Sequence, residues 1–272
     1  MQIRRAIVFP GQGTVGGEVS GGIQDAVQRQ VGDGEVPYQL SVFASSVHLL
    51  GRLREHGIKP NVVAGHSLGE YAAAHAAGSL GLEDGVRLVA ERDRLMNEAS
   101  RENPGAMVAL IKADPMDVVS AVEEVEGVVV AANFNTPRQT VISGEEEAVQ
   151  AVADSVKGRK VRLDVAGAFH SPLMLEASRA MSRLLLEVEL RKPEIPMVSA
   201  VDGAILATVD DLRQALTNQM LSPVRWVAVI ERFRDLGVRE MVEAGEGGTL
   251  TRMLRDFPQD RLKGMTAKEA LA

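Results

Sequence analysis

The spacing of apolar and polar residues predicts alternating strands and helices in the N-terminal third of the chain. Short apolar runs within 4–13 and 60–67 end in Pro or Gly and predict buried strands. The Gly-rich stretch 16–35 is weakly patterned and accommodates one short helix. In contrast, 37–57 predicts a full helix, with Pro near its start and Gly at its end. An Ala-rich helix follows the second strand, and 82–99 repeats its apolar positions with a helical period.

The pattern changes in the middle of the chain. Between 106 and 167 the segments follow the order β, α, β, β, α, β, which is that of a ferredoxin-like subdomain. After it we expect a helix, a strand at 195–201, a second helix, a strand at 238–245 and a last helix. This alternation favours an α/β fold with a parallel sheet, in which 1–105 and 168–272 form the core and 106–167 an inserted subdomain.

Composition narrows the classes of protein to which the chain can belong. Of its 272 residues 45% are hydrophobic, and no apolar run approaches the roughly 20 residues that cross a bilayer. The run before Pro10 is too short for a secretory signal. The absence of cysteine excludes disulfides and thiolate chemistry, and the five histidines lack the spacing of metal ligands. A net charge of -7 argues against nucleic-acid binding. We therefore expect a cytoplasmic protein, taken to be a monomer, that binds no metal, no nucleic acid and no membrane.

A G-x-S-x-G pattern, Gly65 to Gly69, lies between the second predicted strand and the Ala-rich helix. In a chain with 26 glycines the pattern alone is weak, and Ser67 is alternatively the N-cap of a Gly-rich turn. Its strand-turn-helix setting, however, is that of a nucleophile elbow. The helix N-terminus would also offer N–H groups and a positive dipole end to an oxyanion. Ser67 is therefore our candidate nucleophile.

A serine nucleophile needs a base. His66 is adjacent to Ser67, and adjacent side chains diverge. Three other histidines lie in or at the end of predicted helices, where a solvated or hydrogen-bonded role is favoured. His170 follows the last strand of the inserted subdomain, and catalytic residues concentrate in loops at strand ends. By elimination, His170 is the candidate base.

Arg92 interrupts an apolar helix face. A guanidinium that faces inward is costly unless an acceptor pairs with it. An internal ion pair with one of the 37 acidic residues is the simpler interpretation. The functional one is bidentate capture of a substrate carboxylate, favoured because Arg92 lies one helix and a turn after Ser67. The apolar face consists of Leu88, Val89, Leu95, Met96 and Ala99.

Six segments, in order along almost the whole chain, resemble malonyl-CoA:acyl-carrier-protein transacylases and the related acyltransferase domains of polyketide synthases. The resemblance implies an α/β-hydrolase-like core that carries a ferredoxin-like subdomain, in agreement with the pattern above. The matching segments are FPGQG (Phe9–Gly13), GHSLGEYAA (Gly65–Ala73), RLVAERDRLM (Arg87–Met96), ANFNTPRQTVISG (Ala132–Gly144), AFHSPLM (Ala168–Met174) and SPVRW (Ser222–Trp226).

The resemblance also implies a catalytic role for each matching residue. Ser67 would take up the acyl group with His170 as its base, and the backbone N–H groups of Gln12 and Leu68 would form the oxyanion hole. In this family a main-chain carbonyl, not a carboxylate, orients the histidine, and the matching position is Gln219.

On the substrate side, the resemblance implies that Arg92 holds the free carboxylate of malonate. Met96, Phe169 and His66 are expected to complete the substrate site. In polyketide acyltransferases a Phe before the histidine goes with malonyl and a Ser with methylmalonyl. Phe169 is therefore expected to crowd an α-methyl branch.

Three features depart from the family pattern. The usual GQGSQ is GQGTV here, with Val15 in place of the second glutamine, and the segment between Gln12 and Ser67 is shorter than usual. The usual EVGPG is EAGEGG (Glu243–Gly248), which lacks the proline. None of these changes involves the nucleophile, the base or the arginine, but they bear on efficiency and on docking of the carrier protein.

We therefore expect a ping-pong malonyltransferase. The malonyl group would move from malonyl-CoA, through an ester on Ser67, to the phosphopantetheine thiol of an acyl carrier protein, with no permanently bound cofactor. The transacylase subunit of malonate decarboxylase and a stand-alone polyketide acyltransferase share this chemistry and stay open as alternatives. A serine esterase or thioesterase predicts instead a carboxylate oriented toward His170 and turnover without a thiol acceptor. A non-catalytic scaffold is the remaining alternative.

Overall fold

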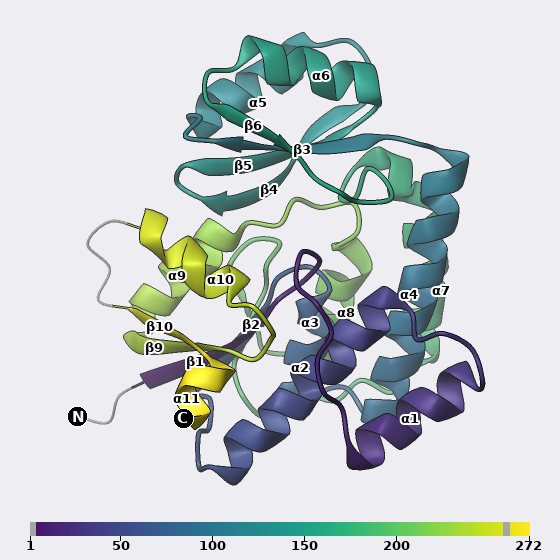
Figure 1. The fold of residues 1–272 in the computed structure, drawn as a ribbon, viewed down its shortest axis with the longest axis vertical. Helices are drawn as coiled ribbons and strands as arrows, with labels where there is room; N and C mark the ends of the chain where they lie inside the picture. The colour runs from purple at the N-terminus through teal and green to yellow at the C-terminus, as the bar shows by residue number, and fades with distance from the viewer. Residues whose placement is uncertain (1–3, 258–261) are drawn as a thin grey trace.

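A six-stranded sheet forms the centre of the larger of two lobes (Figure 1). The computed structural model describes residues 4–257 and 262–272. The strand order is β10-β9-β1-β2-β7-β8, and all neighbours pair in parallel except β7 and β8, which are antiparallel. The expected α/β fold is thus confirmed, but the sheet is mixed where a parallel one was expected. Its strands are β1 (Arg4–Phe9), β2 (Val62–Gly65), β7 (Met197–Val198), β8 (Ile205–Leu206), β9 (Val238–Glu243) and β10 (Lys263–Thr266).

Both faces of this sheet are buried, which explains the uninterrupted apolar runs of its central strands. Along β1, Ile7 and Phe9 point into one apolar cluster, whereas Ala6 and Val8 point into a second one on the opposite face. The helices of this lobe are α1 (Gly21–Val31), α2 (Tyr38–Glu55), α3 (Gly69–Ala76), α4 (Leu82–Glu102), α7 (Leu175–Glu187), α8 (Val209–Asn218), α9 (Trp226–Asp235), α10 (Thr249–Met253) and α11 (Ala267–Leu271), with short 3-10 turns η1 (Pro172–Met174) and η2 (Leu254–Asp256).

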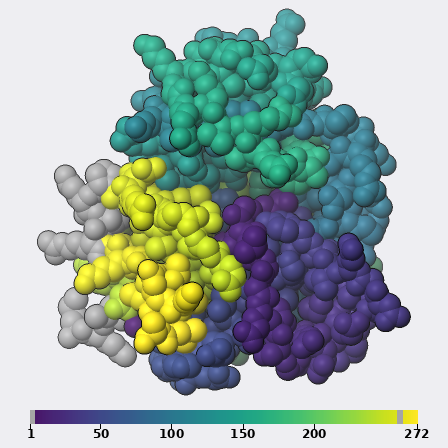
Figure 2. All heavy atoms as spheres, viewed as in Figure 1, coloured from purple at the N-terminus to yellow at the C-terminus, as the bar shows by residue number. Residues whose placement is uncertain are grey.

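The smaller lobe contains a four-stranded antiparallel sheet in the order β4-β5-β3-β6. Figures 1 and 2 show it as a teal body above the purple N-terminal and yellow C-terminal segments. Its two ends meet, because a Cβ placed on Gly105 would lie 2.8 Å from the Cβ of Ala168. The elements follow the expected order: β3 (Ala106–Ile111), α5 (Pro115–Glu124), β4 (Val129–Thr136), β5 (Gln139–Gly144), α6 (Glu146–Ser155) and β6 (Arg159–Arg162).

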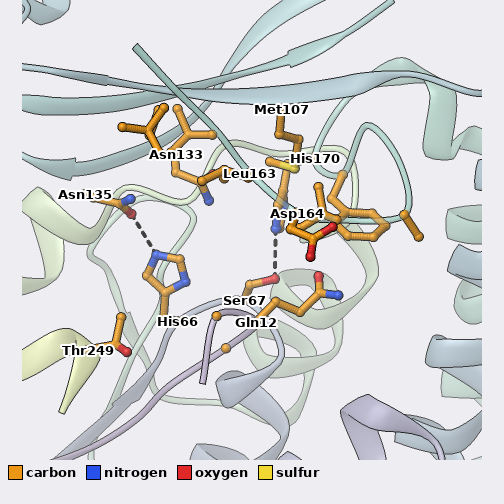
Figure 3. Close-up of a pocket in the computed structure, with 18 of the residues that line it drawn as sticks. Gln12, His66, Ser67, Met107, Asn133, Asn135, Leu163, Asp164, His170 and Thr249 are labelled. Carbon is orange, nitrogen blue, oxygen red and sulfur yellow. Dashed lines mark hydrogen bonds between the residues drawn. The ribbon is translucent and has the colours of Figure 1, made fainter. Parts of the chain in front are cut away.

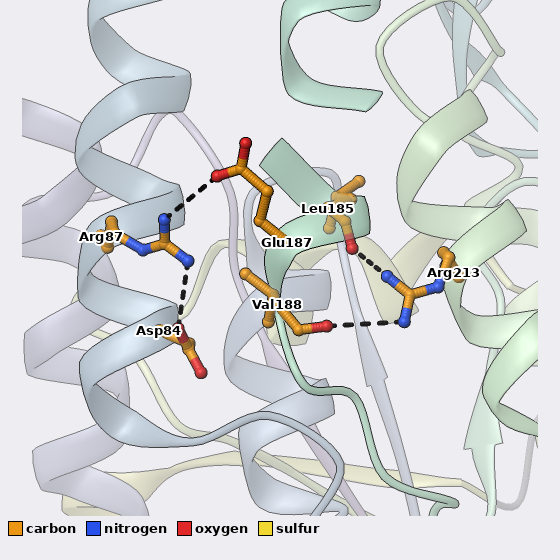
Figure 4. Close-up of polar contacts among 6 residues, drawn as sticks. All are labelled: Asp84, Arg87, Leu185, Glu187, Val188 and Arg213. Carbon is orange, nitrogen blue, oxygen red and sulfur yellow. Dashed lines mark hydrogen bonds and ion pairs between the residues drawn. The ribbon is translucent and has the colours of Figure 1, made fainter. Parts of the chain in front are cut away.

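The C-terminal end of α7 is held between α4 and α8 by two arginines (Figure 4). Arg87 on α4 pairs with Asp84 at 3.3 Å and with Glu187 at 3.7 Å. Arg213 on α8 donates to the carbonyl oxygens of Leu185 and Val188 at the end of α7. These contacts fix α7, which begins directly after the loop that carries His170.

Several short C-terminal elements were not predicted. β8 adds an antiparallel edge, and β10 and α11 follow η2. Two helices, α8 and α9, lie between β7 and β9, where one was expected. None of the helices in the described part of the chain has the length and apolarity that crossing a membrane requires.

Candidate active site

A cavity of about 750 Å3 lies where the small lobe meets the larger one. Figure 3 shows strands of the small lobe above it and the turn that carries Ser67 below. Both lobes contribute, since its wall includes the loop after β1, the start of α2 and inward residues of the small sheet. Among the lining residues are Gln12, Tyr38, Ser67, Asn135, Val161 and Phe169.

Ser67 occupies a sharp turn between β2 and α3, with a positive φ of 52°. A non-glycine residue seldom adopts this left-handed conformation, and a strained turn of this kind is typical of a nucleophile elbow. The flanking glycines are required by close approach: a Cβ on Gly65 would lie 2.0 Å from the carbonyl carbon of Gly69. A Cβ on Gly69 would lie 2.1 Å from the backbone oxygen of Phe9. The turn therefore needs small residues on both sides to hold Ser67 at the cavity floor.

His170 lies within hydrogen-bond distance of Ser67, with 2.8 Å between its Nε2 and the serine Oγ (Figure 3). Its Nδ1 faces two backbone oxygens, that of Gln219 at 2.8 Å and that of Ser222 at 3.0 Å. Since carbonyl oxygens only accept, Nδ1 carries the proton and Nε2 is free to accept one from the serine. Burial, and secondly the positive charge of Arg92, lower the pKa of His170 to about 4. The imidazole is therefore neutral at pH 7.

Arg92 is fully buried on α4, and its guanidinium points toward Ser67. Its Nη2 donates to Ser67 Oγ at 3.1 Å, its Nε donates to Gln219 Oε1 at 3.2 Å, and its Nη1 donates to Gln39 Oε1. The expected apolar face is present around it. These three acceptors are neutral oxygens, so they do not form the internal ion pair considered as its simpler interpretation. Arg92 is not among the residues that line the cavity, and its contact with the site is the hydrogen bond from Nη2 to the Ser67 hydroxyl.

Some of the other predicted site residues line the cavity, and the rest are buried outside its lining. Gln12, His66 and Phe169 line the cavity. Leu68 stands at the N-terminus of α3 with a buried side chain. Met96 lies behind the wall, where its sulfur accepts from Gln39 Nε2 at 3.4 Å.

Sequence reasoning missed three polar residues of this region. Gln39 holds Arg92, and Asn135 accepts from His66 Nε2 at 2.8 Å through its Oδ1. Glu70 is a buried carboxylate bonded to Gln219. A signal existed for Asn135, because it alternates with Asn133 along one strand and two such amides on one face suggest a polar wall.

Among the described residues, no group of three or more His, Asp or Glu side chains is arranged to hold a metal ion.

Comparisons with known proteins agree on one family. The model of the acyl transferase domain family matches residues 24–268. A malonyl CoA-acyl carrier protein transacylase of Bacillus subtilis (strain 168) is 34% identical over 238 residues, which cover 85% of this chain and 75% of that protein.

Solved structures extend the likeness to the whole fold. The malonyl-CoA:ACP transacylase of Synechocystis sp. PCC 6803 superposes with a TM-score of 0.87 at 32% identity and covers 99% of each chain. A malonyl-transacylase solved in complex with a type II PKS acyl-carrier protein gives a TM-score of 0.87 at 31% identity and covers 98% of this chain and 97% of its own. The chain therefore belongs to the acyl transferase domain family.

Proposed function

We propose that the protein is a malonyl-CoA:acyl-carrier-protein S-malonyltransferase. The observation that carries the proposal is the placement of Arg92 Nη2 3.1 Å from Ser67 Oγ, in a site where His170 Nε2 is also 2.8 Å from that oxygen. A nucleophile with a base on one side and a buried cation on the other suits an acyl group that carries a negative charge. The names of the relatives described above support the same substrate and acceptor.

In the proposed first half-reaction, Ser67 Oγ attacks the thioester carbonyl of malonyl-CoA while its proton passes to His170 Nε2. The developing oxyanion would accept hydrogen bonds from the backbone N–H groups of Gln12 and Leu68. Collapse of the tetrahedral intermediate breaks the carbon–sulfur bond, and CoA leaves as a thiol with the proton from His170.

In the second half-reaction, the phosphopantetheine thiol of the carrier protein gives its proton to His170 and attacks the malonyl-serine ester. The serine oxygen leaves and recovers the proton, so the enzyme returns to its starting state. No resident cofactor takes part. The carbonyl oxygens of Gln219 and Ser222 would stabilise the transient imidazolium in place of a triad carboxylate.

We assign the choice of acyl group to Arg92 and Phe169. When malonate is bound, its free carboxylate would pair with the guanidinium, whereas an acetyl group would leave that buried cation without an anionic partner. Phe169 lines the cavity next to His170 and would crowd an α-methyl branch. His66 and Met96 are proposed to shape the same subsite.

We propose the finer fold description in the same terms. The parallel order β9-β1-β2-β7 supports an α/β-hydrolase-like core of residues 1–105 and 168–272, of which 1–3 and 258–261 lie outside the described residues. The strand order β4-β5-β3-β6 supports a ferredoxin-like subdomain of residues 106–167. The cytoplasmic location and the monomeric state stay predictions.

The decisive experiment is intact mass spectrometry after the protein is mixed with malonyl-CoA. We expect a malonyl adduct that is absent in Ser67→Ala and that disappears from the wild type when phosphopantetheinylated carrier protein is added. Arg92→Ala should lose malonyl adduct by about a hundredfold relative to acetyl adduct formed from acetyl-CoA. The absence of any adduct on the wild type would overturn the function, and equal losses for both acyl groups would overturn the role of Arg92.

The same experiment separates the alternatives. A thioesterase would release malonate without an acceptor, and it would need a carboxylate at His170 Nδ1, where the described partners are two backbone oxygens. Transfer to the carrier protein of fatty acid synthesis, of polyketide synthesis or of malonate decarboxylase would identify the pathway.

A further inference from the structure

Glu70 is a buried carboxylate that the mechanism above does not use. It lies in the first turn of α3, three residues after Ser67, and is 1% exposed. Its Oε1 accepts from the backbone N–H of Ala200 at 3.0 Å, and its Oε2 accepts from Gln219 Nε2 at 2.8 Å. A carboxylate in such a place is costly unless donors surround it.

The side-chain donor that Glu70 contacts is the amide of Gln219, a residue that also contacts Arg92 and His170. When Glu70 is ionised it only accepts, so the NH2 group of Gln219 faces Glu70 and its Oε1 faces the other way. In that direction lies Arg92, whose Nε donates to Oε1 at 3.2 Å. The backbone oxygen of the same residue holds His170 Nδ1 at 2.8 Å. One glutamine thus contacts both the arginine and the base.

We propose that Glu70 is a positioning residue, which sets the orientation of the Gln219 amide and thereby aims Arg92 at the acyl group. The proposal rests on the function proposed above, since it explains how that function selects a charged acyl group. The Nε and Nη1 of Arg92 donate to the side-chain oxygens of Gln219 and Gln39. These two hydrogen bonds direct its third nitrogen, Nη2, at Ser67. If the amide turned over, an NH2 group would face the guanidinium, and two donors would repel each other.

The charge of Glu70 fits this role. Burial raises the pKa of the Glu70 carboxyl to about 7, while the hydrogen bonds from Ala200 and Gln219 and the charge of Arg92 lower it. The ionised form, which accepts both hydrogen bonds, therefore predominates only above about pH 7.

The variant Glu70→Gln tests the proposal. Its amide oxygen can still accept from Ala200, but its NH2 group would face the NH2 group of Gln219 and force one amide to turn. We expect kcat/KM for malonyl-CoA to fall about ten- to a hundredfold, and the rate with acetyl-CoA to change little. The readout is the ratio of malonyl to acetyl transfer, which a loss of stability alone would not change.

Glu243→Gln is the matched control. Glu243 is also buried and also held by neutral donors, the N–H and hydroxyl of Thr251 at 2.7 and 2.9 Å, but it lies at the end of β9. We expect this variant to lower the melting temperature and to keep the malonyl-to-acetyl ratio.

A second variant shows whether Glu70 acts through the glutamine. Gln219→Met removes the amide and keeps the backbone oxygen at His170, so it should lower the ratio as Glu70→Gln does. It also keeps the proposal testable if Glu70→Gln does not fold. In the double variant the ratio should fall no further than in Gln219→Met alone.

The outcomes are distinct. A wild type that forms no malonyl adduct would defeat the proposed function itself. A working wild type with an unchanged ratio in Glu70→Gln or in Gln219→Met, or with fully additive losses in the double variant, would overturn the role of Glu70 alone.

Discussion

At the scale of single residues, the neutral state of His170 decides the pH range in which the site can work. Burial lowers its pKa to about 4, with Arg92 as the second cause. We therefore expect the rate of acylation by acetyl-CoA to be nearly flat between pH 7.5 and 5.5 and to fall only as the pH approaches 4, whereas an ordinary histidine would lose activity near pH 6.5. Rapid-quench mass spectrometry with acetyl-CoA as donor measures this profile.

Arg92→Ala provides the control for the same profile. Without the guanidinium, the pKa of His170 should rise, and the acid limb of acetyl transfer should move to higher pH. A wild-type limb centred near pH 6.5 would contradict the burial argument. The same pKa shift affects the stability of the fold. In the unfolded chain His170 binds a proton below about pH 6.5, whereas in the folded protein it binds one only near pH 4. The free energy of unfolding therefore decreases as the pH falls through that window.

Some side chains at Ser67 could be predicted from the sequence and others could not. Arg92 was visible because a guanidinium on an apolar helix face must have a partner, and His170 emerged by elimination. Gln39 was not visible, since a single glutamine in an amphipathic helix gives no sign of which way it faces. Glu70 was equally hidden: an acid in the first turn of a helix is explained by the helix dipole alone. Its burial follows from the position of α8, which the local pattern does not encode.

At the scale of elements, the loop between β1 and α1 is held by a residue that the family pattern does not indicate. The Tyr38 hydroxyl accepts from the N–H of Gly13 at 3.1 Å and donates to the carbonyl oxygen of Thr14 at 2.5 Å. The Thr14 hydroxyl in turn donates to the backbone oxygen of Glu246. The altered GQGTV and EAGEGG segments therefore support each other, and both lie beside the proposed oxyanion residue Gln12.

We expect Tyr38→Phe to lower kcat for malonyl transfer about tenfold with little change in KM. The variant keeps the ring and loses both hydrogen bonds, so the loop that carries Gln12 would be less well ordered in the transition state. Steady-state kinetics with carrier protein, together with a melting curve, measures the effect. Val15→Gln restores the usual family residue at an exposed position and should leave kcat unchanged. Wild-type kcat in Tyr38→Phe would show that the loop is held by other contacts.

Most of the elements that the sequence did not predict are short. β8 has two residues, which is too few for any period to appear, whereas the equally short β7 lies within the strand predicted at 195–201. β10 contains Lys263 and Gly264 and becomes a strand because β9 offers it a parallel edge. Long amphipathic helices and buried strands were predictable because their patterns are repeated over several turns or bounded by Gly and Pro. The antiparallel edge that makes the sheet mixed therefore depended on tertiary contacts.

At the scale of the whole molecule, the two lobes are joined next to His170, the proposed base. Val224 donates to the carbonyl oxygen of Ala132 at 2.8 Å, and its own oxygen accepts from Phe134 at 2.8 Å, so the core segment continues the edge of the small sheet. Two residues before Val224, the backbone oxygen of Ser222 accepts a hydrogen bond from His170 Nδ1. The main apolar cluster also crosses the boundary, since it includes Met107 of the small lobe. These contacts argue that the lobes unfold together.

We therefore expect a single calorimetric transition in which the van't Hoff and calorimetric enthalpies agree.

Val224→Pro should lower the melting temperature and reduce kcat for malonyl and acetyl groups alike, because it removes the backbone donor and disturbs the segment that supports His170. Val224→Ala keeps that donor and loses only part of a buried side chain, so it should lose stability but retain kcat. Equal kcat in the two variants would show that the bridge between the lobes does not support the base. Two separate calorimetric transitions in the wild type would show that the lobes unfold independently. The cavity would then exist only while the two folded lobes are in contact.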